Sequence, residues 1–90
     1  MDNNIDIMIL TQDGCLASFK TMQMFKEGDV EFIECNVTHN PEKINQYNLK
    51  GTPLTVMHED GREKLSISGY NIEAIKQIIS RVKQQTEENE

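Results

Sequence analysis

The sequence predicts an α/β fold in which strands and helices follow the order β-α-β-α-β-β-α. Three observations lead to this prediction: an apolar, isoleucine-rich run near the N-terminus, helical segments that end at glycines, and a hairpin signal in the second half. A strand, a helix and a strand within about 33 residues form a parallel, right-handed unit. An antiparallel hairpin would extend that pair, so we expect a mixed four-stranded sheet with helices on both faces.

The parallel unit occupies the first part of the chain. Residues 5–10, IDIMIL, are almost entirely apolar, which is typical of a strand that is covered on both faces. From Cys15 there is neither glycine nor proline before Gly28, and apolar residues recur mostly at intervals of three and four, which favours a helix that ends at Gly28. These apolar residues are Leu16, Phe19, Met22, Met24 and Phe25. Residues 29–37, DVEFIECNV, are predicted to form the second strand.

The second helix is predicted over residues 40–51. Asn40 is a suitable N-cap, Pro41 takes the first helical position, and Glu42 favours the positive end of the helix dipole. Gly51 is expected to stop this helix.

A hairpin and a third helix complete the predicted fold. Residues 52–68 are expected to form the hairpin because Asp60-Gly61 is a two-residue signal for a type I′ turn. The last helix is predicted to begin at Asn71. Its inward-facing stripe is predicted to consist of Ile72, Ile75, Ile78, Ile79 and Val82.

Length and composition indicate one small domain. The chain has 90 residues, of which 37% are hydrophobic, enough for a compact core but not for a second domain. We assign residues 1–84 to this domain. Residues 85–90 are polar and acidic, and we expect them to form a frayed C-terminal tail.

The charge and the cysteine content narrow the class of function. The net charge of −6 offers no basic surface, so we expect neither a nucleic-acid partner nor an anionic membrane as a partner. No apolar run approaches the roughly 20 residues that span a bilayer. Residues 1–10 carry two acids and no basic residue, unlike a signal peptide. Two cysteines in such a chain favour the reducing cytosol, so we expect a cytoplasmic protein.

Cys15 is the strongest candidate for a reactive residue. It would stand at the start of the first helix, where unpaired backbone N–H groups and the helix dipole favour a thiolate, the nucleophilic form. The charge of Asp13 would oppose this ionisation. Ser18 lies one turn along and can hydrogen-bond to the sulfur but cannot form a disulfide, so a mixed disulfide at Cys15 would wait for an outside thiol. The alternatives are an idle loop cysteine and an ordinary first-turn serine.

The other cysteine and the two histidines give no metal-site signal. Cys35 alternates with Ile33 and Val37 on one face of its predicted strand, which favours a core position. His39 precedes a helix, and His58 lies near a hairpin tip. Two cysteines and two histidines this scattered match no recognisable zinc spacing, so we expect surface histidines and no metal site.

Four short motifs occur in an order that carries a family resemblance. They are Cys15-Leu16-Ala17-Ser18 after the first strand, Thr52-Pro53 before the third, Asp60-Gly61 in the hairpin, and Ser68-Gly69-Tyr70-Asn71 before the last helix. Together they resemble the thioredoxin superfamily, and its glutaredoxin branch in particular, over roughly residues 4–84. The chain is most similar to the small glutaredoxin-like redoxins that deliver electrons to ribonucleotide reductase. The resemblance implies a thioredoxin-like fold.

The resemblance also implies thiol–disulfide exchange at Cys15, with Ser18 as its non-resolving neighbour. Pro53 would be a cis-proline that faces this cysteine, although trans is the default for a Thr-Pro bond from sequence alone. The Thr52 backbone would pair with an extended substrate segment. The implied substrate-binding residues are Gly14, Leu16, Thr52, Pro53, Gly69, Tyr70 and Asn71.

The implied substrates are protein disulfides or glutathione mixed disulfides. Ribonucleotide reductase or another redox enzyme is the candidate protein partner, and glutathione is a candidate co-substrate. We expect no tightly bound cofactor and a monomeric protein.

Several residues depart from the family pattern and keep two other functions open. Asp13-Gly14 replaces the usual aromatic residue or proline before the cysteine, and Ser18 replaces the second cysteine. The loop also lacks the lysine and the Cys-Gly-Phe-Ser motif of glutaredoxins that hold an iron–sulfur cluster. The alternatives are a thioredoxin-fold module that binds protein with weakened redox chemistry, and a dimer that bridges a cluster through Cys15. We favour the oxidoreductase.

Overall fold

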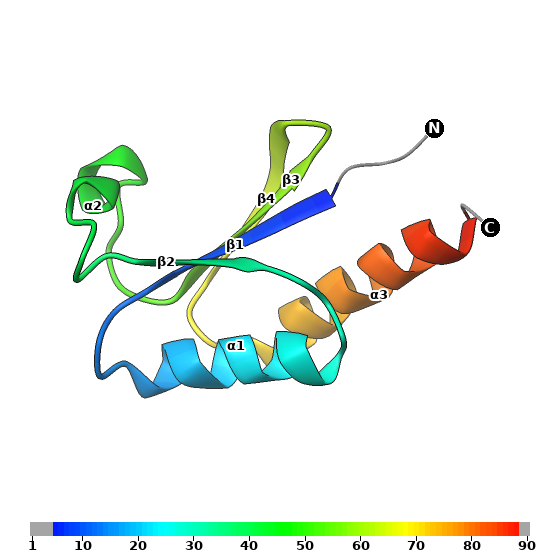
Figure 1. Cartoon of the computed structure of the whole chain (residues 1–90), viewed down its shortest axis with the longest axis horizontal. Coiled ribbons are helices and arrows are strands. Elements are labelled where there is room, and N and C mark those ends of the chain that lie inside the picture. Colours follow the sequence, from blue (N-terminus) through cyan, green and yellow to red (C-terminus); the bar gives the residue numbers. More distant parts are fainter. Residues whose placement is uncertain (1–4, 89–90) are drawn as a thin grey trace.

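The chain follows the predicted order of strands and helices. The computed structural model describes residues 5–88, with side chains described through residue 84. The elements are β1 (Ile5–Thr11), α1 (Leu16–Glu27), β2 (Ile33–Asn36), α2 (Glu42–Gln46), β3 (Leu54–Glu59), β4 (Arg62–Ser68) and α3 (Ile72–Glu88), as labelled in Figure 1. α3 extends into the predicted tail 85–90, and residues 89–90 lie outside the described part of the chain.

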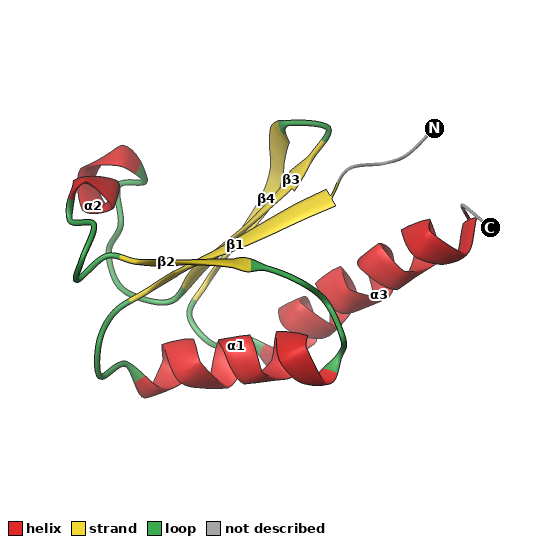
Figure 2. Ribbon diagram, in the orientation of Figure 1, coloured by secondary structure: helices red, strands yellow, loops and turns green. Residues whose placement is uncertain are grey.

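The four strands form the mixed sheet that the sequence predicts. Their spatial order is β2-β1-β3-β4, with β1 parallel to β2 and antiparallel to β3, and β3 antiparallel to β4 (Figure 2). In the parallel pair, Leu10 is aligned with Cys35 and Thr11 with Asn36. The carboxyl ends of β1 and β2 therefore meet at one end of the sheet, the place where open α/β sheets bring their functional residues together.

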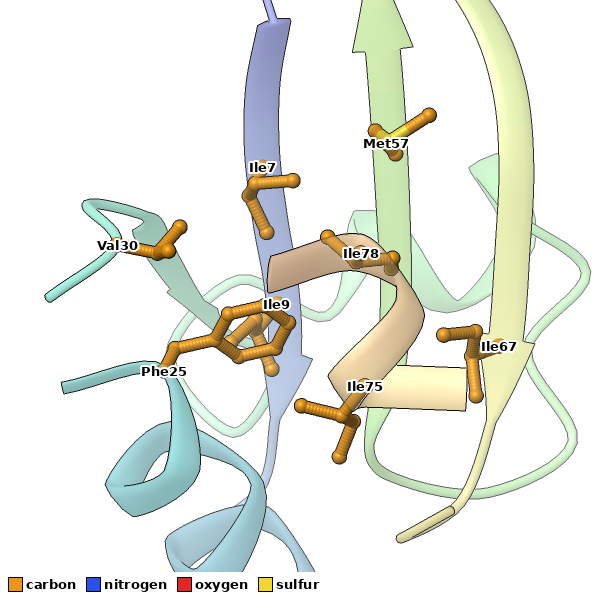
Figure 3. Packing of buried hydrophobic residues seen from close by; sticks show 8 residues of the cluster. All are labelled: Ile7, Ile9, Phe25, Val30, Met57, Ile67, Ile75 and Ile78. Atoms are coloured by element: carbon orange, nitrogen blue, oxygen red, sulfur yellow. The ribbon is translucent and has the colours of Figure 1, made fainter. Parts of the chain in front are cut away.

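The larger of two hydrophobic clusters lies between the sheet and the pair α1 and α3, which share one face in Figure 1. Figure 3 shows its eight buried side chains, which come from strands, helices and the loop before β2: Ile7, Ile9, Phe25, Val30, Met57, Ile67, Ile75 and Ile78. On the opposite face a smaller cluster of Leu10, Val37 and Val56 packs against Tyr47 and Leu49, at the end of α2 and just beyond it. Both faces of the sheet are therefore covered, and no described helix is long and apolar enough to cross a membrane.

α1 forms where the sequence predicts it, but two of its apolar side chains face solvent. Leu16 and Phe19 are 64% and 59% exposed, whereas Ser18, Thr21 and Phe25 are buried. Residues 18, 21 and 25 are separated by three and four positions, so they form one face of the helix, and that face packs on the sheet. The helix thus presents two large apolar side chains beside Cys15.

β2 is shorter than the predicted strand 29–37. Asp29 adopts a φ of 60° in the turn after α1, which delays the start of the strand. Of the three side chains predicted to share a core face, Val37 is buried, Cys35 packs half-buried against the smaller cluster, and Ile33 is 66% exposed. The core position of Cys35 is therefore only partly realised, because β2 is an edge strand.

α2 is also shorter than the predicted helix 40–51. At its start the Asn40 side chain forms no cap, because its Nδ2 donates to the Asn36 backbone oxygen at 2.9 Å. At its end Asn48 adopts a left-handed φ of 51°, a conformation that asparagine tolerates and that commonly ends helices. Asn48, rather than Gly51, therefore stops the helix.

The hairpin and α3 agree closely with the sequence prediction. Asp60 and Gly61 have φ values of 56° and 82°, the two positive values that a type I′ turn requires. The Asn71 side chain caps α3, since its Oδ1 accepts the Ala74 N–H at 3.1 Å. Four of the five predicted stripe residues are buried or half-buried, namely Ile75, Ile78, Ile79 and Val82. Ile72 is 43% exposed because it begins the helix.

Candidate active site

Cys15 lies where β1 passes into α1. After Thr11 a short turn follows, in which Gly14 has a φ of 76° and the Cys15 N–H donates to the Gln12 oxygen at 3.2 Å. Glycine adopts this left-handed conformation without the steric cost of a side chain. Cys15 has extended backbone at the N-cap position of α1, and its oxygen accepts the Phe19 N–H at 3.2 Å. The thiol therefore stands at the start of a helix, as predicted.

The surroundings of the Cys15 thiol favour its ionised form. Hydrogen bonding from the Ser18 side chain lowers the pKa of Cys15 most, followed by the Thr52 side chain, while partial burial opposes them. The backbone N–H groups of Ser18 and Ala17 lower the pKa further, but by less. Two side-chain hydroxyls thus lower the pKa more than the two backbone N–H groups of the first helical turn do. The thiol itself donates to the Thr52 backbone oxygen at 3.5 Å.

Ser18 is placed to respond to that ionisation. Its side chain is 2% exposed, and among the described residues its Oγ has no hydrogen-bond partner in the thiol form. A buried hydroxyl without a partner is costly, and a neighbouring thiolate would supply the missing acceptor. The Thr52 hydroxyl donates to Gln12 Oε1 at 3.3 Å in the thiol form, so the single proton of that hydroxyl would have to turn towards the sulfur.

The Thr52–Pro53 segment lies directly across from Cys15. The peptide bond between these residues is cis, as the family resemblance implied and contrary to the trans default from sequence alone. Pro53 is buried, and its oxygen accepts the Gly69 N–H at 2.8 Å, which ties the end of β4 to this loop. Hydrogen bonds therefore link Cys15 to Thr52, and Pro53 to Gly69.

The remaining predicted residues lie around this centre without forming one groove. Tyr70 is 37% exposed, and its ring lies 5.9 Å from the Lys20 Nζ of α1. Asn71 uses its side chain to cap α3. One hollow between α1 and β2 is lined by Gly14, Cys15, Leu16 and Ser18, whereas a separate hollow on the α2 side is lined by Thr52 and Gly69. Six of the nine predicted site residues are thus divided between two hollows, and Pro53, Tyr70 and Asn71 line neither of them.

The end of β2 contributes residues that sequence reasoning missed. The Asp13 carboxylate accepts the Asn36 Nδ2 at 2.8 Å and lies 3.6 Å from His39 Nε2, while its backbone N–H donates to Thr38 Oγ1 at 3.0 Å. Asp13 is therefore held towards β2. His39, predicted to be an ordinary surface residue, is exposed but lies beside the site loop. The signal was present in the sequence, because polar residues follow both parallel strands and such strand ends meet.

The other cysteine lies outside this site. Cys35 packs with the smaller cluster, on the face of the sheet opposite α1, and both cysteines are free thiols. Within residues 5–88 no group of three or more His, Cys, Asp or Glu side chains is arranged to hold a metal ion. The chemistry available at the site is that of a single thiol with hydroxyl and backbone donors around it.

Comparisons with known proteins give a structural answer only. No family model matches the sequence, and no curated protein is significantly similar to it. The structure resembles a thioredoxin from Schistosoma mansoni, with a TM-score of 0.75, 18% identity, and coverage of 89% of this chain and 80% of that chain. A Fasciola hepatica thioredoxin gives a TM-score of 0.70 at 25% identity, with coverage of 89% and 82%.

A glutaredoxin-like protein is equally similar. NrdH-redoxin from Escherichia coli gives a TM-score of 0.71 at 21% identity, with coverage of 80% of this chain and 92% of that chain. The strand order and these similarities confirm the thioredoxin-like fold that the resemblance implied. The chain has the fold of the thioredoxin superfamily, to which the glutaredoxin-like redoxins also belong.

Proposed function

We propose that this protein is a thiol–disulfide oxidoreductase that acts through Cys15 alone and reduces protein disulfides or glutathione mixed disulfides. One observation carries the proposal: Cys15 stands at the start of α1, opposite Thr52, with a pKa lowered chiefly by the Ser18 and Thr52 side chains. A lowered pKa increases the thiolate fraction near neutral pH, and the thiolate is the attacking species. The thioredoxin-like fold supports this proposal.

The proposed reaction is a series of thiol–disulfide exchanges. The Cys15 thiolate attacks one sulfur of the substrate disulfide, a new S–S bond forms, and the second substrate sulfur leaves as a thiolate that takes a proton from water. Ser18 cannot complete the exchange, because a hydroxyl forms no disulfide. An outside thiol, from glutathione or from a partner protein, then attacks the Cys15 sulfur of the mixed disulfide, so the reduced substrate sulfur leaves and Cys15 becomes disulfide-bonded to that thiol. A second outside thiol attacks this new disulfide and releases Cys15 as a thiolate. The two outside thiols supply the two electrons and leave joined as a disulfide.

Substrate binding would use the exposed surface around the thiol. The Thr52 oxygen that meets Cys15 is one backbone group that an extended segment could pair with. Ribonucleotide reductase stays one candidate partner, alongside other enzymes that form a disulfide during turnover. A monomer in the cytoplasm fits this proposal.

The direct test measures reduction of a glutathionylated peptide in the presence of glutathione. Cys15→Ala should reduce the rate to that of glutathione alone, because it removes the nucleophile. Cys35→Ala is the matched control, since it removes the other free thiol from the opposite face of the sheet. Equal rates for the wild-type protein and Cys15→Ala would refute the proposal.

A second candidate function is a protein-binding module with weak redox chemistry. Leu16 and Phe19 favour it, because large apolar side chains this exposed are typical of a contact surface. The pH dependence of iodoacetamide alkylation at Cys15 separates the two functions. A thiol that reacts readily near neutral pH supports the oxidoreductase, whereas a thiol that titrates like free cysteine supports the module.

A further inference from the structure

The two flanks of Cys15 carry opposite charges. On the β2 flank, the hollow beside the thiol contains two charged side chains, Asp13 and Glu34, and both are acidic. On the flank towards the start of α3, the Lys20 Nζ lies near the Tyr70 ring. β2 and β4 form opposite edges of the sheet, so these two environments lie on different sides of the nucleophile. A substrate segment that crosses Cys15 would meet negative charge on the β2 side.

Glu34 is held in place without being neutralised. The hydroxyl of Thr11, which is 1% exposed, donates to Glu34 Oε2 at 2.7 Å. That hydrogen bond fixes the carboxylate at the wall of the hollow but leaves its charge intact. Within the described residues no lysine or arginine forms an ion pair with Glu34. Its charge is therefore available to a ligand.

Asp13 adds a second carboxylate, also held mainly by a neutral donor. Asn36 Nδ2 bonds to it at 2.8 Å, and the nearby His39 carries a charge only when protonated. Ser18, whose hydroxyl is buried and without a partner among the described residues, also lines this hollow. Two acidic residues, this serine and Cys15 thus line one hollow.

The rim of this hollow is apolar. Leu16 and Phe19, which are among the most exposed large apolar side chains described, both line it. A small anionic disulfide such as oxidised glutathione complements neither the charge nor this rim. A polypeptide segment with a cationic side chain complements both, since an apolar neighbour can cover the rim.

From this arrangement we infer that the preferred substrate is a protein disulfide whose cysteine has a lysine or arginine within about two positions, with that cation placed against Glu34 and Asp13. An extended segment advances about 3.3 Å per residue, so such a side chain can reach the wall of a hollow that also contains Cys15. The inference rests on the proposed function and specifies its substrate. The chemistry is the exchange already described, with attack by Cys15 and release by an outside thiol.

The test uses three synthetic peptides that differ only at the position next to one cysteine, which is lysine, glutamine or glutamate. Each cysteine is presented as a mixed disulfide with uncharged 2-mercaptoethanol, so that the charge of the small thiol is constant. The second-order rate of peptide-disulfide loss is measured with the reduced protein by acid quench and mass spectrometry. Each rate is divided by the rate of the same peptide with dithiothreitol, which corrects for intrinsic reactivity.

We expect the lysine peptide to react about fivefold faster than the glutamate peptide at low salt, the size that exposed charge pairs produce. Glu34→Gln should lower this ratio, because glutamine can still accept the Thr11 hydrogen bond but carries no charge, while the Asp13 carboxylate remains. Glu34→Lys should lower the ratio further, to about one, because the new positive charge offsets that of Asp13. Glu27→Gln is the matched control, since it makes the same change of net charge at an exposed position at the far end of α1 and should keep the preference.

The outcomes separate the two proposals. If Cys15→Ala abolishes the reaction of all three peptides but the wild-type protein reacts with them equally, the charge preference is refuted and the oxidoreductase stands. A lysine preference that is unchanged in both Glu34 variants also refutes it. If Cys15→Ala leaves all three rates unchanged, the proposed function fails and this inference fails with it.

Discussion

The two helices that cover one face of the sheet begin in contrasting ways. α3 begins with Asn71, whose side chain accepts the Ala74 N–H and satisfies one of the unpaired donors of the first turn. α1 begins with Cys15, whose side chain makes no cap and instead contacts the Thr52 oxygen. The start of α3 therefore contributes stability through its cap. At the start of α1 the backbone N–H groups have no side-chain cap, and they are available to the negative charge that Cys15 carries when its thiol ionises.

The largest effect is expected when the N-cap residue of α1 is replaced by asparagine, the residue that caps α3. In Cys15→Asn, the extended backbone at position 15 suits an asparagine cap, so we expect the free energy of unfolding to rise by about 0.5–1 kcal/mol. Disulfide reduction should fall to background because no nucleophile remains. Urea unfolding and the peptide assay measure the two effects. A variant that loses activity and also loses stability would contradict the view that Cys15 takes the place of a stabilising cap.

The next largest effect concerns the hydroxyl that assists the thiolate. Ser18→Ala should slow alkylation of Cys15 at neutral pH by roughly three- to tenfold, because a hydrogen bond to a charged group is lost. Thr21→Val is a matched control, since Thr21 is another buried hydroxyl of α1 without a partner in the described residues, one turn further along. Equal alkylation rates in Ser18→Ala and wild type would show that Ser18 does not stabilise the Cys15 thiolate.

A smaller effect is expected from removing the cap of α3. Asn71→Ala should lower the free energy of unfolding by about 1 kcal/mol, and Asn71→Asp should restore most of it because aspartate caps equally well. Chemical denaturation of the three proteins at one pH measures this difference. If Asn71→Ala is as stable as wild type, the Asn71 cap does not stabilise α3, and the contrast with the uncapped start of α1 is contradicted.

The smallest effect is a difference in pH dependence between the two helix starts. The folded-state pKa of Cys15 is lowered, so the thiolate stabilises the fold fully above the unfolded-state pKa of about 8.5, and this contribution is lost as the pH falls through the folded-state pKa. The stability difference between wild type and Cys15→Ala should therefore increase from pH 6 to pH 9.5. The difference between wild type and Asn71→Ala should stay constant over that range, and parallel curves for both pairs would contradict the assignment.

The sequence predicts the framework of the fold because its strongest signals are local. Asp60-Gly61 determines the hairpin turn, and Asn71 marks the start of α3, and both depend only on neighbouring residues. The lengths of β2 and α2 were harder to predict. The conformations of Asp29 and Asn48 decide them, and a left-handed asparagine or aspartate has no unique sequence signal.

The sequence predicted a reactive cysteine at the start of a helix. It did not predict the hydrogen bonds that hold the charged residues around that cysteine. The environment of Asp13 depends on Asn36 and His39, which are more than 20 positions away and come near only because β1 and β2 are parallel. The fixed carboxylate of Glu34 depends on Thr11 in the same way. To predict contacts between residues at the ends of two strands, one must know the register of the sheet, and a single sequence does not specify it.

The buried serine next to Cys15 has a kinetic consequence. In the proposed reaction Ser18 cannot carry the covalent complex with the substrate forward, because it offers no sulfur to break it. The rate at which the complex goes on to reduced substrate is then proportional to the concentration of outside thiol. At a high thiol concentration the protein behaves as a fast catalyst, and at a low one as a covalent tether. A single hydroxyl would in this way make the time spent bound to a partner a measure of the reducing capacity of its surroundings.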